Sequence, residues 1–208
     1  MRHLPLCLLL LSLAACTDRM APSDDRWSGG GELIAMSGGE AGVRYACVGC
    51  HGARGEGNGF DAPRLAGLPA GYLQKQMEDY ALGLRPHGVM RDVARFLDSH
   101  ERVKVASYYA ALPVQPGDAV APAASALYVR ACQQCHGAHA AGTPLGPPLA
   151  GQPAFYLAQQ LQDWQAAKRR NDGNHEMLKV AQQLNADEVH ELSRYLAQLP
   201  PRPAGPAR

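Results

Sequence analysis

The chain has 208 residues, 46% of them hydrophobic, which is enough for one or two packed domains and too apolar for a disordered chain. Lysine and arginine total 20 against 19 aspartate and glutamate, and this balance argues against a nucleic-acid partner, which requires a basic face. Aromatic residues make up only 6% of the chain, so we expect something other than aromatic side chains to help fill the interior.

Residues 1–15 are predicted to be a lipoprotein-type signal peptide that exports the protein to the periplasm. A basic start at Arg2 precedes an apolar run over 4–15, which is shorter than the roughly 20 residues that span a membrane. The run ends at Cys16 in a sequence that resembles the bacterial lipoprotein box. Lipidated Cys16 would anchor the chain to a membrane surface through a polar tether at 16–30. Ordinary cleavage nearby, with Cys16 incidental, is the alternative.

A Cys-x-x-Cys-His sequence at Cys47, Cys50 and His51 is the signature of covalent haem c attachment. Two residues between the cysteines form about one helical turn, which places both sulfurs beneath the vinyl groups of one porphyrin. The histidine that follows can then bind the iron. The sequence therefore predicts a haem group joined to this segment by two thioether bonds.

The same signature occurs again at Cys132, Cys135 and His136, so we expect two haem c groups in the chain. Four cysteines and two histidines can also bind zinc, but zinc does not require a histidine directly after the second cysteine in both copies. Two redox disulfides are a further alternative in an oxidising compartment, and this alternative leaves both histidines unexplained.

The second half of the chain repeats the first. Residues 65–73 match residues 149–157 at an offset of 84, and the match continues at an offset of 87 from Met90 and Met177 onward. Two repeats of this length indicate two domains rather than a solenoid. The predicted organisation is a tether up to residue 30, a first domain at 31–113, a Pro/Gly/Ala-rich linker at 114–123, a second domain at 124–200 and a disordered tail at 201–208.

We expect an all-α fold, in which each domain has a few helices around its haem. Apolar spacing and capping patterns predict helices at 32–36, 72–82 and from Asp98 to Pro113 in the first domain, and at 125–132, 156–167 and from Asn185 to Pro200 in the second. Asp98 and Asn185 each stand three residues before a glutamate, the pattern of a capping box. Glycines at 38, 39 and 42 weaken the first helix.

The second ligand of each iron decides what the haem does, because a methionine sulfur raises the potential and suits electron transfer. Met90 and Met177 occupy equivalent positions and are expected to lie in loops before the last helix, so we predict them as the distal ligands. Met77 aligns with Leu161 and is interpreted as a core residue. His87 and His175, just before the two methionines, are the alternative ligands.

A proline follows each haem motif, Pro63 twelve residues after His51 and Pro147 eleven residues after His136. A proline carbonyl can accept the N–H of the imidazole and fix the orientation of the ring. These prolines are therefore expected to lie directly behind the iron-binding histidines, and a role in shaping the loops is compatible with that.

These features together resemble the class I c-type cytochromes, and the tandem arrangement resembles the cytochrome c4 group. The resemblance rests on both Cys-x-x-Cys-His-Gly motifs, the Pro-x-Leu-Ala-Gly segments from Pro63 and Pro147, the helices from Tyr72 and Tyr156, and the paired methionines. It implies His/Met ligation of both haems, and domains packed around a pseudo-twofold axis. It also implies electron shuttling in the periplasm, for example from a quinol-oxidising complex to a terminal oxidase.

We therefore predict an electron carrier with no catalytic residues. Two features depart from the family: the glycine-rich segment 38–45 and the lipoprotein box, which is unlike a freely diffusing carrier. A cytochrome subunit of a membrane-associated dehydrogenase or a dihaem enzyme such as a peroxidase is the alternative. A peroxidase would need a haem with a displaced or different distal ligand.

Overall fold

A computed structural model describes residues 30–115 and 120–202. The predicted signal peptide, Cys16, the tether up to residue 29, the middle of the linker and most of the tail lie outside the described residues. Over the part that is described, the protein is helical, and its one strand-like feature is an isolated bridge between Thr143 and Gly146. The all-α prediction is confirmed.

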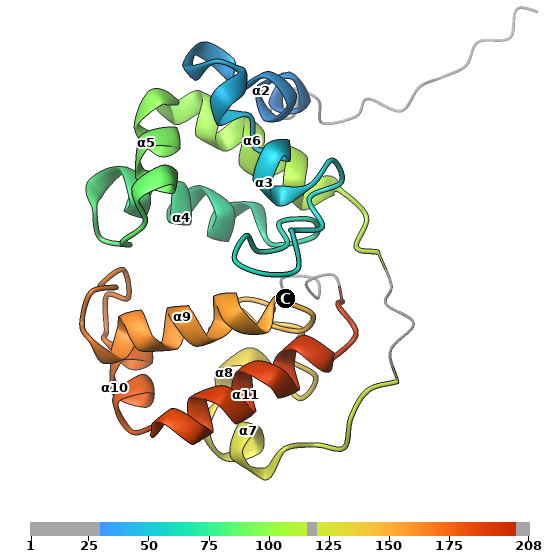
Figure 1. The fold of residues 1–208 in the computed structure, drawn as a ribbon, viewed down its shortest axis with the longest axis vertical. Coiled ribbons are helices and arrows are strands. Elements are labelled where there is room, and N and C mark those ends of the chain that lie inside the picture. Colours follow the sequence, from blue (N-terminus) through green and yellow to red (C-terminus); the bar gives the residue numbers. More distant parts are fainter. Residues whose placement is uncertain (1–29, 116–119, 203–208) are drawn as a thin grey trace, which may run out of the picture.

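Each domain contains a short helix at its haem motif and longer helices that pack around it (Figure 1). The first domain consists of α2 (Gly31–Ser37), α3 (Val48–His51), α4 (Ala70–Leu82), α5 (Gly88–Phe96) and α6 (Ser99–Ala111), with 3-10 turns at Gly39–Ala41 and Val43–Tyr45. The second consists of α7 (Ala126–Ala131), α8 (Gln133–His136), α9 (Ala154–Gln165), α10 (Glu176–Gln182) and α11 (Ala186–Gln198). These helices include all those expected, and α3, α5, α8 and α10 are additional.

The last helix of each domain begins with the predicted capping box. The side chain of Asp98 accepts the N–H of Glu101 at 2.8 Å, and the Glu101 carboxylate accepts the N–H of Asp98 at 2.9 Å. Asn185 and Glu188 make the same two bonds, both at 3.0 Å. Each box satisfies two backbone donors that a helix start otherwise leaves unpaired, which explains why α6 and α11 begin at equivalent residues.

The sequence led us to expect the two methionines in loops, and this expectation is wrong. Met90 is the third residue of α5 and Met177 the second residue of α10, so both are in the first turn of a short helix. These helices run for only a few turns, and packing rather than intrinsic propensity stabilises helices of this length. Their apolar pattern is accordingly too short to identify in the sequence.

Each domain has its own hydrophobic core. In the first, α2, α4, α5 and α6 pack around Tyr109, which is 1% exposed, and in the second, α7, α9 and α11 pack around Tyr128, which is fully buried. The approach of α2 to α6 is so close that a Cβ atom at Gly31 would lie 2.3 Å from the carbonyl oxygen of Lys104. Glycine is therefore required where these two helices cross.

The domains meet with α4 and α9 facing each other (Figure 1). Arg64 and Gln152 join them by two bonds: the Arg64 N–H donates to the glutamine oxygen at 2.9 Å, and the glutamine nitrogen donates to the Arg64 carbonyl at 3.0 Å. Phe60 and Phe155 stack across the boundary with ring centroids 4.3 Å apart. The interface thus combines buried polar contacts with an aromatic pair.

No helix in the described ranges 30–115 and 120–202 has the length and apolar character needed to cross a membrane.

Candidate functional site

Both motif histidines are buried and are held from behind by the predicted prolines. His51 is 7% exposed and its Nδ1 lies 2.9 Å from the carbonyl oxygen of Pro63. His136 is 6% exposed and its Nδ1 lies 2.9 Å from the Pro147 carbonyl. A carbonyl can only accept, so Nδ1 must carry the proton in both rings. The lone pair of each Nε2 is then free to bind a metal.

The prolines reach the histidines because the loop after each motif closes in the same way. The carbonyl of His51 accepts the N–H of Gly57 at 2.8 Å, and the carbonyl of His136 accepts the N–H of Gly142 at 2.9 Å. Further along, the N–H groups of Leu65 and Leu149 each donate at 2.8 Å to a backbone carbonyl inside the loop. Equivalent bonds in both repeats show that the loops position the prolines and do not merely connect helices.

The environment of the two histidines favours the neutral ring. Burial lowers the pKa of His51, and the hydrogen bond to the Pro63 carbonyl opposes this effect in part. Burial lowers the pKa of His136 in the same way, against the bond to Pro147. Because a metal binds the unprotonated nitrogen, a lowered pKa keeps both imidazoles ready to act as ligands.

His51 and Met90 line a single cavity of about 530 Å³, whose wall is formed mostly by the first domain and completed by residues of the second. Cys50 also lines it, and the surrounding wall includes Leu68 from the loop before α4, together with Leu73 and other apolar residues of α4 and α6. A space of this size with an apolar wall and a few polar groups is typical of a cofactor site. The structure thus brings together a predicted attachment residue and both predicted axial ligands of the first haem.

The first cysteine of each motif lies where a neutral sulfur is favoured. Cys47 packs against the first core and Cys132 against the second, and burial raises the pKa of each thiol to about 11. Zinc binding and thiol redox chemistry both use the thiolate, which this environment disfavours, whereas a thioether carries no charge. No group of three or more His, Cys, Asp or Glu side chains that could hold a metal ion occurs among the described residues.

The backbone of each predicted distal methionine is held by a polar side chain. His87 precedes α5, and its Nδ1 accepts the N–H of Met90 at 3.2 Å, so this histidine caps the helix that carries the methionine. In the second domain, Asp172 Oδ2 accepts the N–H of Met177 at 2.5 Å. His175 is exposed and makes no side-chain cap bond in the described structure.

Comparison with known proteins agrees with this geometry. The sequence profile of the family described as Cytochrome c matches residues 38–108 and 121–200, once in each domain. The chain belongs to the cytochrome c family. Among its relatives, a cytochrome c4 from Thiocapsa roseopersicina is 35% identical over 77% of this chain and 91% of its own length. A thiosulfate dehydrogenase electron acceptor from Stutzerimonas stutzeri is 35% identical over 84% of this chain and 88% of its own length.

Two solved structures share the fold of this cytochrome. Reduced cytochrome c4 from Pseudomonas stutzeri superposes with a TM-score of 0.69 at 27% identity, covering 83% of this chain and 98% of that one. Thiosulfate dehydrogenase TsdBA from Marichromatium purpuratum superposes with a TM-score of 0.70 at 37% identity, covering 82% of this chain and 40% of that one. The chain therefore spans less than half of the Marichromatium protein. These matches confirm two tandem cytochrome c domains of the cytochrome c4 type.

Membership of this family shows that the cytochrome carries covalently bound haem c and transfers electrons, and that it is not itself the catalyst of a substrate reaction. The first cavity fits this group, because it combines an apolar wall with a neutral histidine and a methionine. The haem supplies an iron that changes by one electron. The chain supplies the ligands and keeps the iron in an apolar environment.

Sequence analysis did not single out two residues at the cavity and the domain boundary. Arg85 lines the cavity and is 4% exposed, and Arg169, which is 8% exposed, lies beside it across the interface. They are related by the same offset of 84 that relates Gln76 to Gln160. This repeated position is the feature of the sequence that could have identified the two arginines, because an arginine that is simply exposed on a surface need not occupy the same place in both repeats.

Proposed function

We propose that this cytochrome is an exported two-haem electron carrier, with one haem c in each domain. Both haems are attached by thioether bonds and ligated by a histidine and a methionine. The attachment residues are Cys47 and Cys50 in the first domain and Cys132 and Cys135 in the second. The axial ligands are His51 and Met90 for the first iron, and His136 and Met177 for the second.

The observation that carries this proposal is the pairing of His51 and Met90 in one apolar cavity, with the histidine fixed by Pro63. Sulfur opposite imidazole raises the potential of a haem and leaves no open coordination position. Such an iron suits electron transfer rather than peroxide activation. The Pro147 carbonyl holds His136 at the same 2.9 Å, which supports an equivalent arrangement in the second domain.

The test is a spectroscopic redox titration of the purified holoprotein, together with a pyridine haemochrome assay and intact mass. We expect two haems per chain and the weak far-red ferric absorption band that methionine sulfur gives. Two one-electron steps should be resolved. One haem per chain, or absence of the far-red band from both haems, would contradict the proposal. Turnover of peroxide would instead favour the dihaem peroxidase alternative.

We further propose that the electron donor is a thiosulfate-oxidising dehydrogenase. Support comes from the relatives named as electron acceptors of thiosulfate dehydrogenase and from the likeness to part of the Marichromatium TsdBA protein. The electron count also agrees. Joining two thiosulfate ions through a new sulfur–sulfur bond releases two electrons, and two haems that each accept one electron can take both.

Stopped-flow reduction would test this partner. The oxidised cytochrome is mixed with a thiosulfate dehydrogenase and thiosulfate, and haem reduction is followed with either component omitted as the control. Rapid reduction that needs both components is the expected result. If the cytochrome is reduced faster by a quinol-oxidising complex, and not by the dehydrogenase, it belongs in the chain from that complex to a terminal oxidase instead.

Export and lipid anchoring at Cys16 complete the proposal, because the apolar run that ends at this cysteine resembles a lipoprotein signal. The test is fractionation of cells that express the wild type or Cys16→Ser, with labelling by a radioactive fatty acid. The wild type should be labelled and sediment with membranes. A wild-type protein that is unlabelled and remains in the periplasmic fraction would show that cleavage occurs elsewhere and that Cys16 is incidental.

A further inference from the structure

One end of the first domain exposes a group of apolar side chains. Figure 1 shows α2 and the turns that follow it at the end of this domain that lies away from the second domain. The helix α5 packs against the first of these turns. Four apolar residues of these elements are exposed: Leu33 at 70%, Met36 at 39%, Val43 at 80% and Phe96 at 54%. We call these four residues the apolar end.

The glycine-rich segment 38–45 brings the helices of the apolar end together. Gly38 has a φ of 80°, and a Cβ atom there would overlap the carbonyl oxygen of Gly42, so the chain turns back tightly after α2. At the end of the segment, the ring of Tyr45 lies 5.2 Å from that of Phe96, the last residue of α5. The segment that departs from the family pattern thus forms the centre of this surface.

The second domain buries its side chain at the equivalent place. Val43 and Tyr128 each stand four residues before the first cysteine of their motif, and Tyr128 is fully buried. Single exposed apolar residues are normal on a protein surface, but several of them at one end indicate an interaction surface. Because the repeat shows that a buried aromatic suits this position, the exposed valine indicates a contact that the first domain alone makes.

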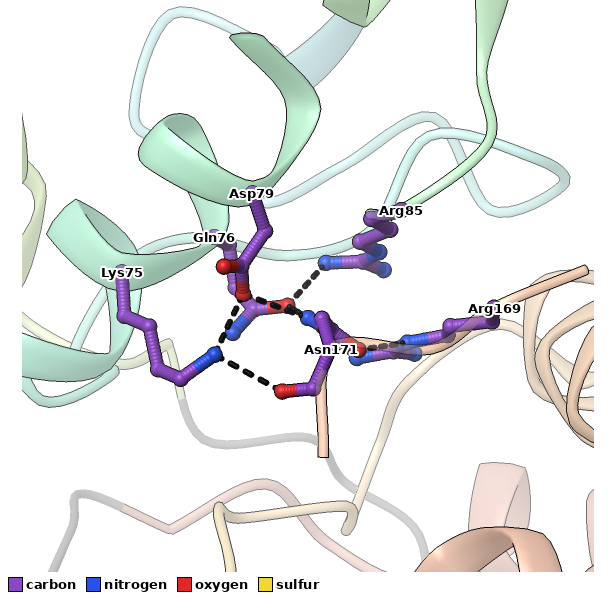
Figure 2. Close-up of polar contacts among 6 residues, drawn as sticks. All are labelled: Lys75, Gln76, Asp79, Arg85, Arg169 and Asn171. Atoms are coloured by element: carbon purple, nitrogen blue, oxygen red, sulfur yellow. Dashed lines mark hydrogen bonds and ion pairs between the residues drawn. The ribbon is translucent and has the colours of Figure 1, made fainter. Parts of the chain in front are cut away.

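The opposite end of the first domain is occupied by the second domain. There Asn171 donates to the Asp79 carboxylate at 2.7 Å, and Lys75 donates to the backbone carbonyl of Asn171 at 2.7 Å (Figure 2). Polar bonds of this kind join the two domains. The apolar end therefore faces away from the interface, and its partner is not the second domain.

The charges around the apolar end are balanced. A protein partner recognised by charge needs an excess of one sign on the surface that it meets. The guanidinium of Arg44 lies 5.1 Å from the centroid of the Tyr45 ring, and an arginine beside exposed aromatic and aliphatic side chains is typical of the boundary between water and lipid. The exposed charged residues of α2, segment 38–45 and α5 are three acidic and three basic: Glu32, Glu40, Asp92, Arg44, Arg91 and Arg95.

The place where the tether joins the domain favours a lipid partner. Gly30 stands directly before α2, and Cys16 is fourteen residues earlier. Fourteen residues reach at most about 50 Å, so a lipid on Cys16 holds this end of the molecule at high local concentration beside a bilayer. We propose that the apolar end rests on the membrane surface, with Leu33, Val43 and Phe96 in contact with lipid. This inference rests on the lipid anchoring in the proposed function, and it adds which face of the cytochrome the membrane meets.

This orientation leaves the second domain accessible. The second domain lies at the other end of the molecule (Figure 1), so it faces the aqueous compartment and can meet a soluble redox partner. Because the tether supplies a high local concentration, the apolar end needs to bury only a few side chains in the bilayer.

Photo-crosslinking to lipid tests the contact. The lipidated holoprotein is reconstituted on phosphatidylcholine vesicles that contain a photoactivatable phospholipid, and the crosslinked peptides are identified by mass spectrometry. Beyond the tether, we expect lipid adducts to be concentrated in peptides that contain α2, segment 38–45 and Phe96. The double change Leu33→Glu and Val43→Glu should reduce these adducts about tenfold, because it places two charges where apolar side chains meet lipid. Adducts spread evenly over both domains, or concentrated in the second, would overturn the proposal.

The matched control is Val129→Glu, because Val129 is an exposed valine of α7 in the second domain. It should leave the adducts unchanged, and all the substituted residues are exposed, so every variant should keep the unfolding temperature of the wild type. The balanced charges predict a further result. Adduct yield should stay the same when anionic lipid is added to the vesicles and when the salt concentration is raised. Loss of the adducts in salt would overturn an apolar contact.

Lipidation and sedimentation separate this inference from the anchoring on which it rests. Both are measured for the wild type and every variant. A wild type without lipid on Cys16 would refute the anchoring and this inference with it. A wild type that is lipidated and sediments with vesicles, but gives adducts only in the tether, would refute the contact alone. Protection of α2 from hydroxyl-radical labelling by a thiosulfate dehydrogenase, and not by vesicles, would assign the apolar end to a protein partner and overturn the proposal.

Discussion

In both domains the ring nitrogen of the motif histidine donates to a proline carbonyl at 2.9 Å. The backbone N–H groups of the two predicted distal methionines, in contrast, bind different side chains in the two domains. A histidine caps the helix of Met90, and an aspartate binds the N–H of Met177. The proximal side is built by a short loop within which the donor and the acceptor are close in sequence. The distal side lies beyond a segment that differs by three residues between the repeats, so its local contacts could diverge.

The backbone shows a second difference between the domains. Gly55 and Gly83 of the first domain have positive φ angles, and the second domain has alanines, Ala140 and Ala167, at the corresponding places, each with a φ of 52°. Left-handed geometry costs a residue with a Cβ atom about 1–2 kcal/mol. The second domain therefore maintains the loop geometry at the expense of strain, which indicates that the turn is needed for the position of the site and is not just a local preference.

The largest effect should come from exchanging the distal sulfur for nitrogen in one domain at a time. Met90→His should lower the potential of one haem by on the order of 0.1 V or more, within the roughly 0.8 V range over which axial ligands tune haem. Met177→His should do the same to the other haem. In each variant the far-red band should lose about half its intensity in the ferric spectrum.

These two variants test whether the two domains bind their irons in the same way. Retention of the full band in Met90→His would show that another residue, such as His87, binds the first iron. Leu161→Met is the matched control, because it adds a methionine at the position equivalent to Met77 and should leave both potentials unchanged.

A smaller effect is expected where α2 crosses α6. These two helices lie so close together that their contact needs a glycine, and this requirement is found only in the first domain. Gly31→Ala places a methyl group on the Lys104 carbonyl and should destabilise the first domain by about 1–3 kcal/mol, the usual range for overpacking. Gly71→Ala is the control. It lies in α4 with open space around it and should be neutral or stabilising by up to about 1 kcal/mol. Denaturant unfolding followed by circular dichroism measures both.

Much of the site could be predicted because it depends on short spacings. The histidine, its proline partner and the capping boxes each involve residues within about a dozen positions, so local chemistry specifies them. The helices that carry the two methionines, α5 and α10, were not predicted, because short helices are stabilised by packing, which the sequence pattern does not display. The cluster of Arg85 and Arg169 was missed for another reason: its contacts cross between domains, and only the repeated offset of 84 marks the pair.

The two capping boxes should differ in how their contribution to stability depends on pH. Asn185→Ala should destabilise the second domain by about 1 kcal/mol at every pH, because the amide does not titrate. Asp98→Ala should also destabilise, but its effect should depend on pH. The N–H of Glu101 lowers the pKa of Asp98 below its usual 3.8, so the contribution is complete above that value and is lost as the pH falls through the lowered pKa. Unfolding curves at neutral and acidic pH distinguish the two domains.

The smallest effect concerns the ends of α4 and α9, where the first domain has Gly83 and the second has Ala167 at equivalent positions. Gly83 has a φ of 77° and open space around its Cα, so Gly83→Ala adds no clash and tests the backbone alone. It should cost about 1 kcal/mol. Ala167→Gly removes the same strain and should stabilise the second domain, by less than 1 kcal/mol because glycine also gains entropy in the unfolded chain. If both changes destabilise, Ala167 is held by contacts that outweigh its strained backbone, and the domains differ in packing at this turn rather than only in the residue that occupies it.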